Sequence, residues 1–372
     1  CMRGAVKKGV RKPSAMVLIW GVGVVFLLSS CAGTRVAIKG PHRCLKEVEA
    51  EVAKYGGDSG EADLGGVRDL LRKAAKLSRF HPARAAGHYF QAAEEARLLG
   101  DGAAAEIYFA HAIGHGTALV HELDGWDGGR HYPGADRSYR VALALQARHP
   151  GEPRRFDSLV LAERLEVEGF DQMVELEGVG APMVGAREWT EERKRQNQFL
   201  HSGGSDMAVT MWAEISKDGT VTCRCLNPRK TRTVVSEGRR LDLAANFTAP
   251  IATTVREERW ENWGLKGVLS PSRFLDKIGL YSLEEPDPQR IPVVLAHGLL
   301  SKPETWTPVY NNLLADRRIR ENFQFYFFFY PTGLPPLYPG AGLRRELGEL
   351  HAYLKSRGGG RNINRMVLIG HS

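Results

Sequence analysis

The feature that most constrains the fold is a regular alternation of apolar runs and amphipathic stretches over residues 286–372. The apolar runs are short, as in strands that are buried on both faces of a sheet, and they lie at 291–296, 323–330 and 366–369. Between them, apolar residues recur at helical spacing over 301–314 and 341–356. Alternating strands and helices with short turns predict right-handed crossovers and a parallel α/β sheet.

The residues at the ends of two of these strands point to nucleophilic chemistry. His297-Gly298-Leu299 follows the first strand, and Gly370-His371-Ser372 follows the third. A serine nucleophile on a tight strand-to-helix turn needs small residues beside it, and the glycine of the second motif is one of them. Because the carboxyl ends of parallel strands meet at one edge of a sheet, we expect the two motifs to lie together.

Together with Tyr330-Pro331-Thr332-Gly333 at the end of the second strand, these motifs resemble the α/β-hydrolase fold, in particular bacterial lipase-like and esterase-like hydrolases. The resemblance covers residues 290–372. It implies that Ser372 is the nucleophile, that the backbone N–H of Leu299 is one oxyanion donor, and that no cofactor is needed. It gives four further residues a role in shaping the two motifs rather than in acid–base catalysis: His297, Gly298, Gly370 and His371.

The resemblance also implies that a catalytic acid and a histidine base follow the serine in the chain. Ser372 is the last residue, and Cys1 precedes the first methionine, Met2. We therefore expect this chain to be a fragment that holds the N-terminal half of a hydrolase domain over 286–372. The acid, the base and the second oxyanion donor are expected beyond it, so the fragment alone is expected to be inactive.

The N-terminal 30 residues have the pattern of a secretory signal, with a basic stretch followed by a short apolar run at 15–28. A transmembrane helix would need about 20 apolar residues. The run ends in Leu28-Ser29-Ser30-Cys31, which resembles a bacterial lipobox and implies that Cys31 becomes a lipidated N-terminus. Ala32 then favours transport to an outer membrane. The alternative is a plain signal peptide cleaved nearby, with an incidental cysteine.

After a predicted linker over 31–66, residues 67–150 are expected to form an α-helical domain that could bind a protein partner. Six positions resemble a single tetratricopeptide-like hairpin: Tyr89, Ala93, Ala96, Ala105, Phe109 and Ala112. A small helical domain without repeats is the alternative. Three histidines, at His111, His115 and His121, lie close together without a carboxylate pattern, so we interpret them as structural and predict no metal site.

Residues 151–285 are predicted to be β-rich, with turn signals between short strands at 158–161, 207–215, 220–225 and 231–235. Cys223 and Cys225 lie two residues apart, but without a second cysteine or histidine pair they do not form a zinc pattern. A disulfide from Cys44 to one of them stays open. No catalytic constellation is evident in this segment.

The formal net charge of +8 comes from Lys and Arg residues scattered along the chain, which argues against nucleic acid as a partner. The sequence therefore predicts a lipid-anchored serine hydrolase of the bacterial cell envelope. It would cleave carboxylic esters, with lipid-like substrates expected, through an acyl-enzyme on Ser372. The alternative is a non-enzymatic envelope lipoprotein, in which the helical hairpins bind a partner and the hydrolase fold is degenerate.

Overall fold

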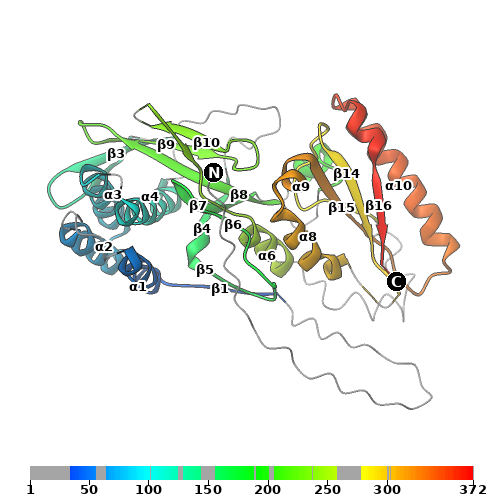
Figure 1. The fold of residues 1–372 in the computed structure, drawn as a ribbon, viewed down its shortest axis with the longest axis horizontal. Coiled ribbons are helices and arrows are strands. Elements are labelled where there is room, and N and C mark those ends of the chain that lie inside the picture. Colours follow the sequence, from blue (N-terminus) through cyan, green and yellow to red (C-terminus); the bar gives the residue numbers. More distant parts are fainter. Residues whose placement is uncertain are drawn as a thin grey trace, which may run out of the picture.

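The protein was analysed as a computed structural model. It describes residues 34–55, 64–100, 102–124, 129–143, 156–187, 190–200, 205–236, 238–257, 278–299, 301 and 303–371. The predicted signal segment, Cys31 and Ser372 lie outside these residues. The described part contains a helical segment, a curled mixed sheet and a smaller C-terminal sheet with its own helices (Figure 1).

The N-terminal helices form one layer on the left of Figure 1. Their bounds are α1 (Pro41–Val52), η1 (Ala53–Tyr55), α2 (Gly65–Leu77), α3 (Pro82–Leu98) and α4 (Ala103–Asp124). Proline in the first turn of α1 and of α3 suits a helix start, because its missing N–H would have no partner there. Among the helices that the structure describes, none combines the length and apolar character needed to cross a bilayer.

The curled sheet has six strands in the order β2-β3-β9-β8-β7-β4. Their bounds are β2 (His131–Pro133), β3 (Ser138–Leu143), β4 (Ser158–Leu161), β7 (Ala181–Arg187), β8 (Ser205–Ile215) and β9 (Thr220–Leu226). Only the β3–β9 pair is parallel. The predicted strands at 158–161, 207–215 and 220–225 are therefore confirmed as members of this sheet.

Several short elements complete this half of the molecule. They are β1 (Arg35–Ile38), η2 (Ala162–Arg164), β5 (Leu165–Glu168), β6 (Glu175–Leu176), α5 (Glu191–Gln196), β10 (Thr233–Ser236), β11 (Arg239–Asp242), β12 (Ala245–Asn246) and α6 (Thr248–Glu257). Three two-stranded ladders pair β1 with β5, β6 with β12 and β10 with β11. The last ladder contains most of the strand expected at 231–235.

The helices and the six-stranded sheet share one hydrophobic core. It includes Tyr89 and Phe109 from the helices together with Trp212 and Val221 from the sheet. Glycine allows the closest approach: an added Cβ at Gly87 of α3 would lie 2.3 Å from the backbone carbonyl of Pro133 in β2. The helices and the six-stranded sheet therefore form a single packed unit, and the segment 67–150, which was expected to be helical, also supplies β2 and β3 of that sheet.

The predicted linker over 31–66 also differs from the structure. Residues 41–52 form α1, and its side chains Leu45, Val48 and Val52 are buried in the same core. An amphipathic stripe of this kind anchors a helix. The described part of 31–66 is therefore largely packed structure.

The C-terminal sheet has four strands in the order β13-β15-β14-β16. The strands are β13 (Gly279–Tyr281), β14 (Ile291–Ala296), β15 (Phe323–Phe329) and β16 (Val367–Gly370), and the helices are η5 (Pro303–Trp306), α8 (Thr307–Leu314), α9 (Arg317–Asn322), α10 (Leu337–Ser356) and η6 (Arg361–Arg365). Strands β15 and β16 both pair with β14 in parallel, whereas β13 pairs with β15 antiparallel. The three strands expected at 291–296, 323–330 and 366–369 are therefore parallel to one another as predicted, and β13, which precedes the predicted domain, adds an antiparallel edge.

Alternating residues of β14 and β15 pack on the two faces of this sheet. Val293 and Phe325 pack with α8 on one face, and Val294 and Tyr326 pack with α10 on the other. This alternation explains the continuous apolar runs of β14 and β15, since a strand with helices on both faces has no solvent side, whereas the apolar residues of β16 are exposed.

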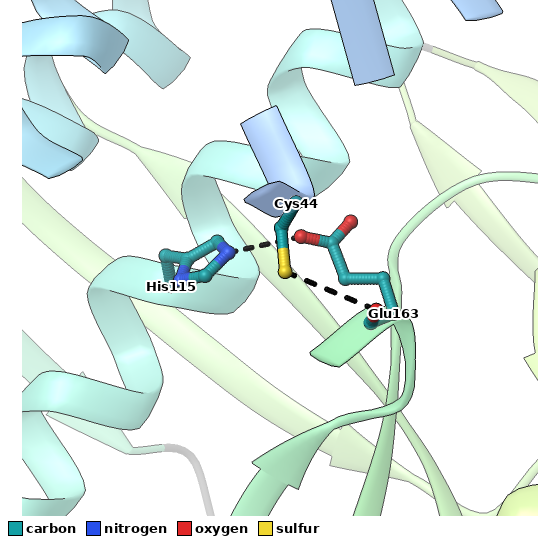
Figure 2. A group of neighbouring side chains, drawn as sticks. All are labelled: Cys44, His115 and Glu163. Atoms are coloured by element: carbon teal, nitrogen blue, oxygen red, sulfur yellow. Dashed lines mark hydrogen bonds and ion pairs between the residues drawn. The ribbon is translucent and has the colours of Figure 1, made fainter. Parts of the chain in front are cut away.

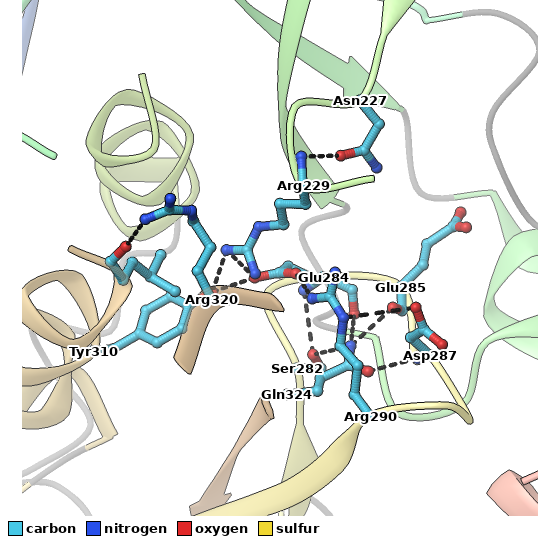
Figure 3. A network of polar contacts seen from close by, with 11 residues as sticks. Asn227, Arg229, Ser282, Glu284, Glu285, Asp287, Arg290, Tyr310, Arg320 and Gln324 are labelled. Atoms are coloured by element: carbon cyan, nitrogen blue, oxygen red, sulfur yellow. Dashed lines mark hydrogen bonds and ion pairs between the residues drawn. The ribbon is translucent and has the colours of Figure 1, made fainter. Parts of the chain in front are cut away.

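A buried polar network joins the loop after β9 to the C-terminal sheet (Figure 3). Arg229 forms an ion pair with Glu284 and donates to the Tyr310 hydroxyl, which in turn donates to the same carboxylate. Arg290 lies 3.6 Å from Glu284 on its other side. Helix α6 adds an apolar contact, because Phe247 just before it and Ile251 within it share a core with β14 and β15. The two halves are thus held by both polar and apolar contacts.

Candidate active site

The register of the C-terminal sheet brings the two sequence motifs together at one edge. In the parallel β14–β16 ladder Ala296 pairs with Gly370, so each strand ends at the same level. The backbone N–H of His371 continues the ladder by donating to the carbonyl of Ala296 at 3.1 Å. His297 and Leu299 follow one strand while Gly370 and His371 end the other, as expected for parallel neighbours. In Figure 1 this edge lies near the end marked C.

His297 is fixed by contacts on all sides and is buried. Its ring stacks on Tyr330, with the centroids 4.4 Å apart and the planes 9° apart. Its Nδ1 lies 3.2 Å from the carbonyl of Gly298, and its Nε2 lies 3.4 Å from the backbone N of Tyr330. A proton on Nδ1 satisfies both contacts, because that nitrogen then donates and Nε2 accepts. Burial lowers the pKa of His297 to about 4, so the ring is neutral near pH 7.

Tyr330 links the second strand to the same edge. Its hydroxyl donates to the backbone carbonyl of His297 at 2.7 Å. The three strand ends therefore meet: His297 after β14, Tyr330 after β15 and His371 after β16. These contacts leave His297 without a free nitrogen for acid–base chemistry, and they hold the chain before Leu299 in one conformation.

Leu299 lies in a tight turn whose closing hydrogen bond does not use its backbone N–H. Ser301 donates its backbone N–H to the carbonyl of Gly298 at 3.2 Å, which closes a four-residue turn. In such a turn the N–H of the second residue takes no part in the closing hydrogen bond. Leu299 is that residue, and its side chain is 73% exposed. Its N–H is thus a candidate donor at the carboxyl edge of the sheet.

Gly370 and His371 have more open surroundings than His297. An added Cβ at Gly370 would meet no described atom within 4 Å, so the described neighbours do not require a glycine there. His371 is exposed, and its ring makes an edge contact with Trp306 at 5.9 Å between centroids. The Nε1 of Trp306 is buried without a hydrogen-bond partner among the described residues.

The strand order reverses at this edge. From β14 the chain adds β15 on one side, and it then crosses back to add β16 on the other side. In open α/β sheets, ligands bind outside the carboxyl ends of the strands where the order reverses in this way. Both motifs flank that position.

Tyr330 belongs to one of the sequence motifs, but its contacts with His297 were not predicted, and neither was the position of Trp306 beside His371. Tyr330 ends an aromatic run and Trp306 begins an amphipathic helix, so each fits an ordinary core position. One feature could have indicated that they belong to the site: both are large amphipathic side chains within one turn of a strand or helix end. Ser372 and Cys31, the nucleophile and lipidation candidates, lie outside the described residues.

Comparisons with known protein families, with curated proteins and with solved structures find no match for this chain.

Proposed function

We propose that the chain is the N-terminal part of a serine hydrolase, in which Ser372 attacks the carbonyl of a carboxylic ester. The single observation that carries the proposal is the β14–β16 ladder, which sets Gly370 and His371 beside His297–Leu299 at the carboxyl edge. Ser372 comes directly after His371 in the chain. A nucleophile and an oxyanion donor must both reach one carbonyl group, so neighbouring strand ends are where this chemistry requires them.

The strand order supports the α/β-hydrolase assignment further. The resemblance in the motifs implies an oxyanion loop after one strand and a nucleophile after a later parallel strand. The C-terminal sheet has the reversal of order and the helices on both faces that such a site needs. The locked, neutral His297 fits a loop-shaping role. The resemblance takes the acid and the base from residues after Ser372, so neither role falls on a described residue.

The exposed apolar side chains near this edge favour lipid-like esters. Leu299 is 73% exposed after β14, and Leu337 and Tyr338 at the start of α10 are 89% and 54% exposed. Each of these large apolar side chains is available to contact an apolar ligand. A lipid anchor on Cys31 would hold the enzyme at the bacterial envelope, close to such substrates.

The non-enzymatic alternative has less support. Partner-binding helical hairpins need an accessible face, but ten of the 17 residues of α3 and 13 of the 22 residues of α4 are buried. Both helices pack against the six-stranded sheet, and α2 and α1 cover them further by contacting α3 and α4.

The test is ester hydrolysis by the full-length protein. We expect the wild type to hydrolyse p-nitrophenyl esters, faster for longer acyl chains than for acetate, and Ser372→Ala to abolish this activity without changing the circular dichroism spectrum. Equal rates for the wild type and a folded Ser372→Ala variant would refute the proposal. Membrane fractionation of Cys31→Ser tests the anchor separately, because an unchanged membrane-bound fraction would reject lipidation.

A further inference from the structure

Four buried or half-buried side chains from three separate segments converge on the far side of the molecule from the carboxyl edge. Cys44 comes from α1, His111 and His115 lie one turn apart on α4, and Glu163 lies on η2. Figure 2 shows Cys44, His115 and Glu163 pointing toward one another. A His-x-x-x-His spacing on a helix places both imidazoles on the same face. This cluster takes no part in the proposed ester chemistry.

The contacts within the cluster centre on Glu163. Its Oε1 lies 2.7 Å from Nδ1 of His111 and 2.9 Å from Nε2 of His115. The Cys44 sulfur lies 3.9 Å from the backbone carbonyl of Glu163, which is a weak hydrogen bond. One carboxylate oxygen, two ring nitrogens and a thiol thus crowd together, and the thiol has no strong partner there.

Burial makes this arrangement unusual. Cys44, His111 and His115 are each at most 3% exposed, whereas the side chain of Glu163 is 31% exposed and opens the cluster to solvent. The Nε2 of His111 has no hydrogen-bond partner in the described part of the chain. Buried polar atoms normally find partners, so a polar cluster with one unmatched nitrogen and one weakly bonded thiol needs an explanation.

The donor set matches the chemistry of a transition-metal site. One ligand atom from each of Cys44, His115 and Glu163 lies within 4.8 Å of the others. Thiolate, imidazole and carboxylate are the three ligand types that bind Zn²⁺, at about 2.0–2.3 Å. A tetrahedral site with such bonds has its ligand atoms roughly 3.5 Å apart. Small side-chain rotations would bring the three ligand atoms from their present separation to this distance.

We propose that Cys44, His115 and Glu163 bind a divalent transition-metal ion, with zinc as the expected ion, and that His111 holds the Glu163 carboxylate in place by its hydrogen bond. Metal ligands are commonly oriented by such a neighbour. On binding, the thiol proton of Cys44 leaves as the Cys44–metal bond forms. The proton on Nε2 of the neutral His115 ring moves to Nδ1, which leaves the lone pair of Nε2 free to bind the metal.

The local charges suit a dication. The Cys44 thiolate and the Glu163 carboxylate together supply two negative charges to balance the ion. The cations that act on Cys44 are Lys39 and Arg164. Lys39 is already paired with Glu47, which reduces its repulsion of a metal. Because the ligands come from α1, α4 and η2, a bound ion would tie the predicted linker region to the shared core.

The test is a titration of the full-length, metal-stripped protein with Co²⁺, which occupies zinc sites and reports a thiolate ligand by a near-ultraviolet charge-transfer band. We expect the band to saturate at one equivalent per chain, and added Zn²⁺ to displace the cobalt. Cys44→Ser should abolish the band. Cys223→Ser is the matched control, because Cys223 is a free, fully buried thiol in β9 and should keep the band.

The histidine variants sharpen the assignment. His111→Gln should weaken Co²⁺ binding by about 10- to 100-fold, the usual effect of losing a supporting residue, and His115→Gln by at least that factor. The control is His88→Gln, since His88 is buried on α3 but bonds only to the carbonyl of Arg84 among the described residues. It should bind cobalt like the wild type.

Three outcomes would overturn the proposal. They are the absence of a charge-transfer band in the wild type together with no zinc by elemental analysis, a band that survives in Cys44→Ser, and a band lost equally in Cys223→Ser. If Cys44→Ser does not fold, the wild-type titration and the comparison of His115→Gln with His88→Gln still decide the question.

Discussion

Replacing Leu299 by proline should remove the proposed oxyanion donor with little other damage. Proline lacks a backbone N–H, and it is favoured at the second position of a tight turn, which Leu299 occupies between Gly298 and Ser301. The turn is closed by the N–H of Ser301, which the substitution leaves intact. The side chain of Leu299 is 73% exposed, so little packing is lost.

The expected magnitude follows from this geometry. Loss of one preorganised donor raises the barrier of an acyl transfer by about 3 kcal/mol, which lowers kcat roughly 100- to 1,000-fold. Leu299→Ala removes the same side chain but keeps the N–H, and as a surface substitution it is expected to change the free energy of unfolding by no more than about 0.5 kcal/mol, so it measures the contribution of the side chain alone. The assay is the steady-state hydrolysis of a p-nitrophenyl ester by the full-length protein.

The comparison of the two variants isolates the N–H group. Thermal unfolding of each variant shows whether the fold is retained. If folded Leu299→Pro is as active as Leu299→Ala, then the N–H of Leu299 does not stabilise the transition state. The assignment of the oxyanion loop to this turn would then be refuted.

Three further predictions concern stability, measured as the free energy of unfolding in urea. Gly87→Ala should destabilise the protein by about 2 kcal/mol, because the added Cβ would meet the Pro133 backbone. The control is Gly348→Ala in α10, which has open space around it and should stabilise the protein by up to about 1 kcal/mol. Equal effects of the two substitutions would contradict the packing of α3 on β2. The pKa of His297 is lowered from 6.5 to about 4, so the free energy of unfolding should fall by up to about 3 kcal/mol as the pH drops from 6.5 to about 4. In His297→Gln the free energy of unfolding should lack this dependence on pH. Glu284→Gln should cost about 2 kcal/mol by leaving Arg229 unpaired, and a neutral result would remove the network's role in joining the halves.

The C-terminal strands could be predicted well because their signal is local. The predicted run at 291–296 coincides with β14, and the run at 323–330 exceeds β15 by one residue. Strands buried on both faces are apolar at every position, and the short turns leave few alternatives. Strand β13 escaped prediction because three residues, Gly279–Tyr281, are too short to show a period.

The organisation of the N-terminal half could not be read in the same way. Helix α4 is buried on nearly every side, so its sequence has no polar stripe to show that it packs against a sheet as well as against α3. The strand β2 has only three residues, and its place depends on contacts far away in the sequence. Propensity identifies such elements poorly, because tertiary packing decides them.

The two candidate sites also differ in how well they could be predicted from the sequence. The edge formed by His297, Leu299 and Gly370 was predictable, since motifs at the ends of parallel strands must meet. The cluster around Glu163 was not, because it joins Cys44 to a residue 119 positions away. The spacing of His111 and His115 was visible in the sequence, but without the carboxylate it favoured a structural interpretation.

The central claim, that Ser372 is an activated nucleophile, is tested most directly by mapping the site of a fluorophosphonate adduct. The full-length protein is treated with the probe and digested, and the modified peptide is identified by mass spectrometry. We predict one adduct per chain, on Ser372, that is lost when the protein is unfolded before treatment. An unmodified Ser372 in the folded protein, or an adduct confined to another serine, would contradict the account.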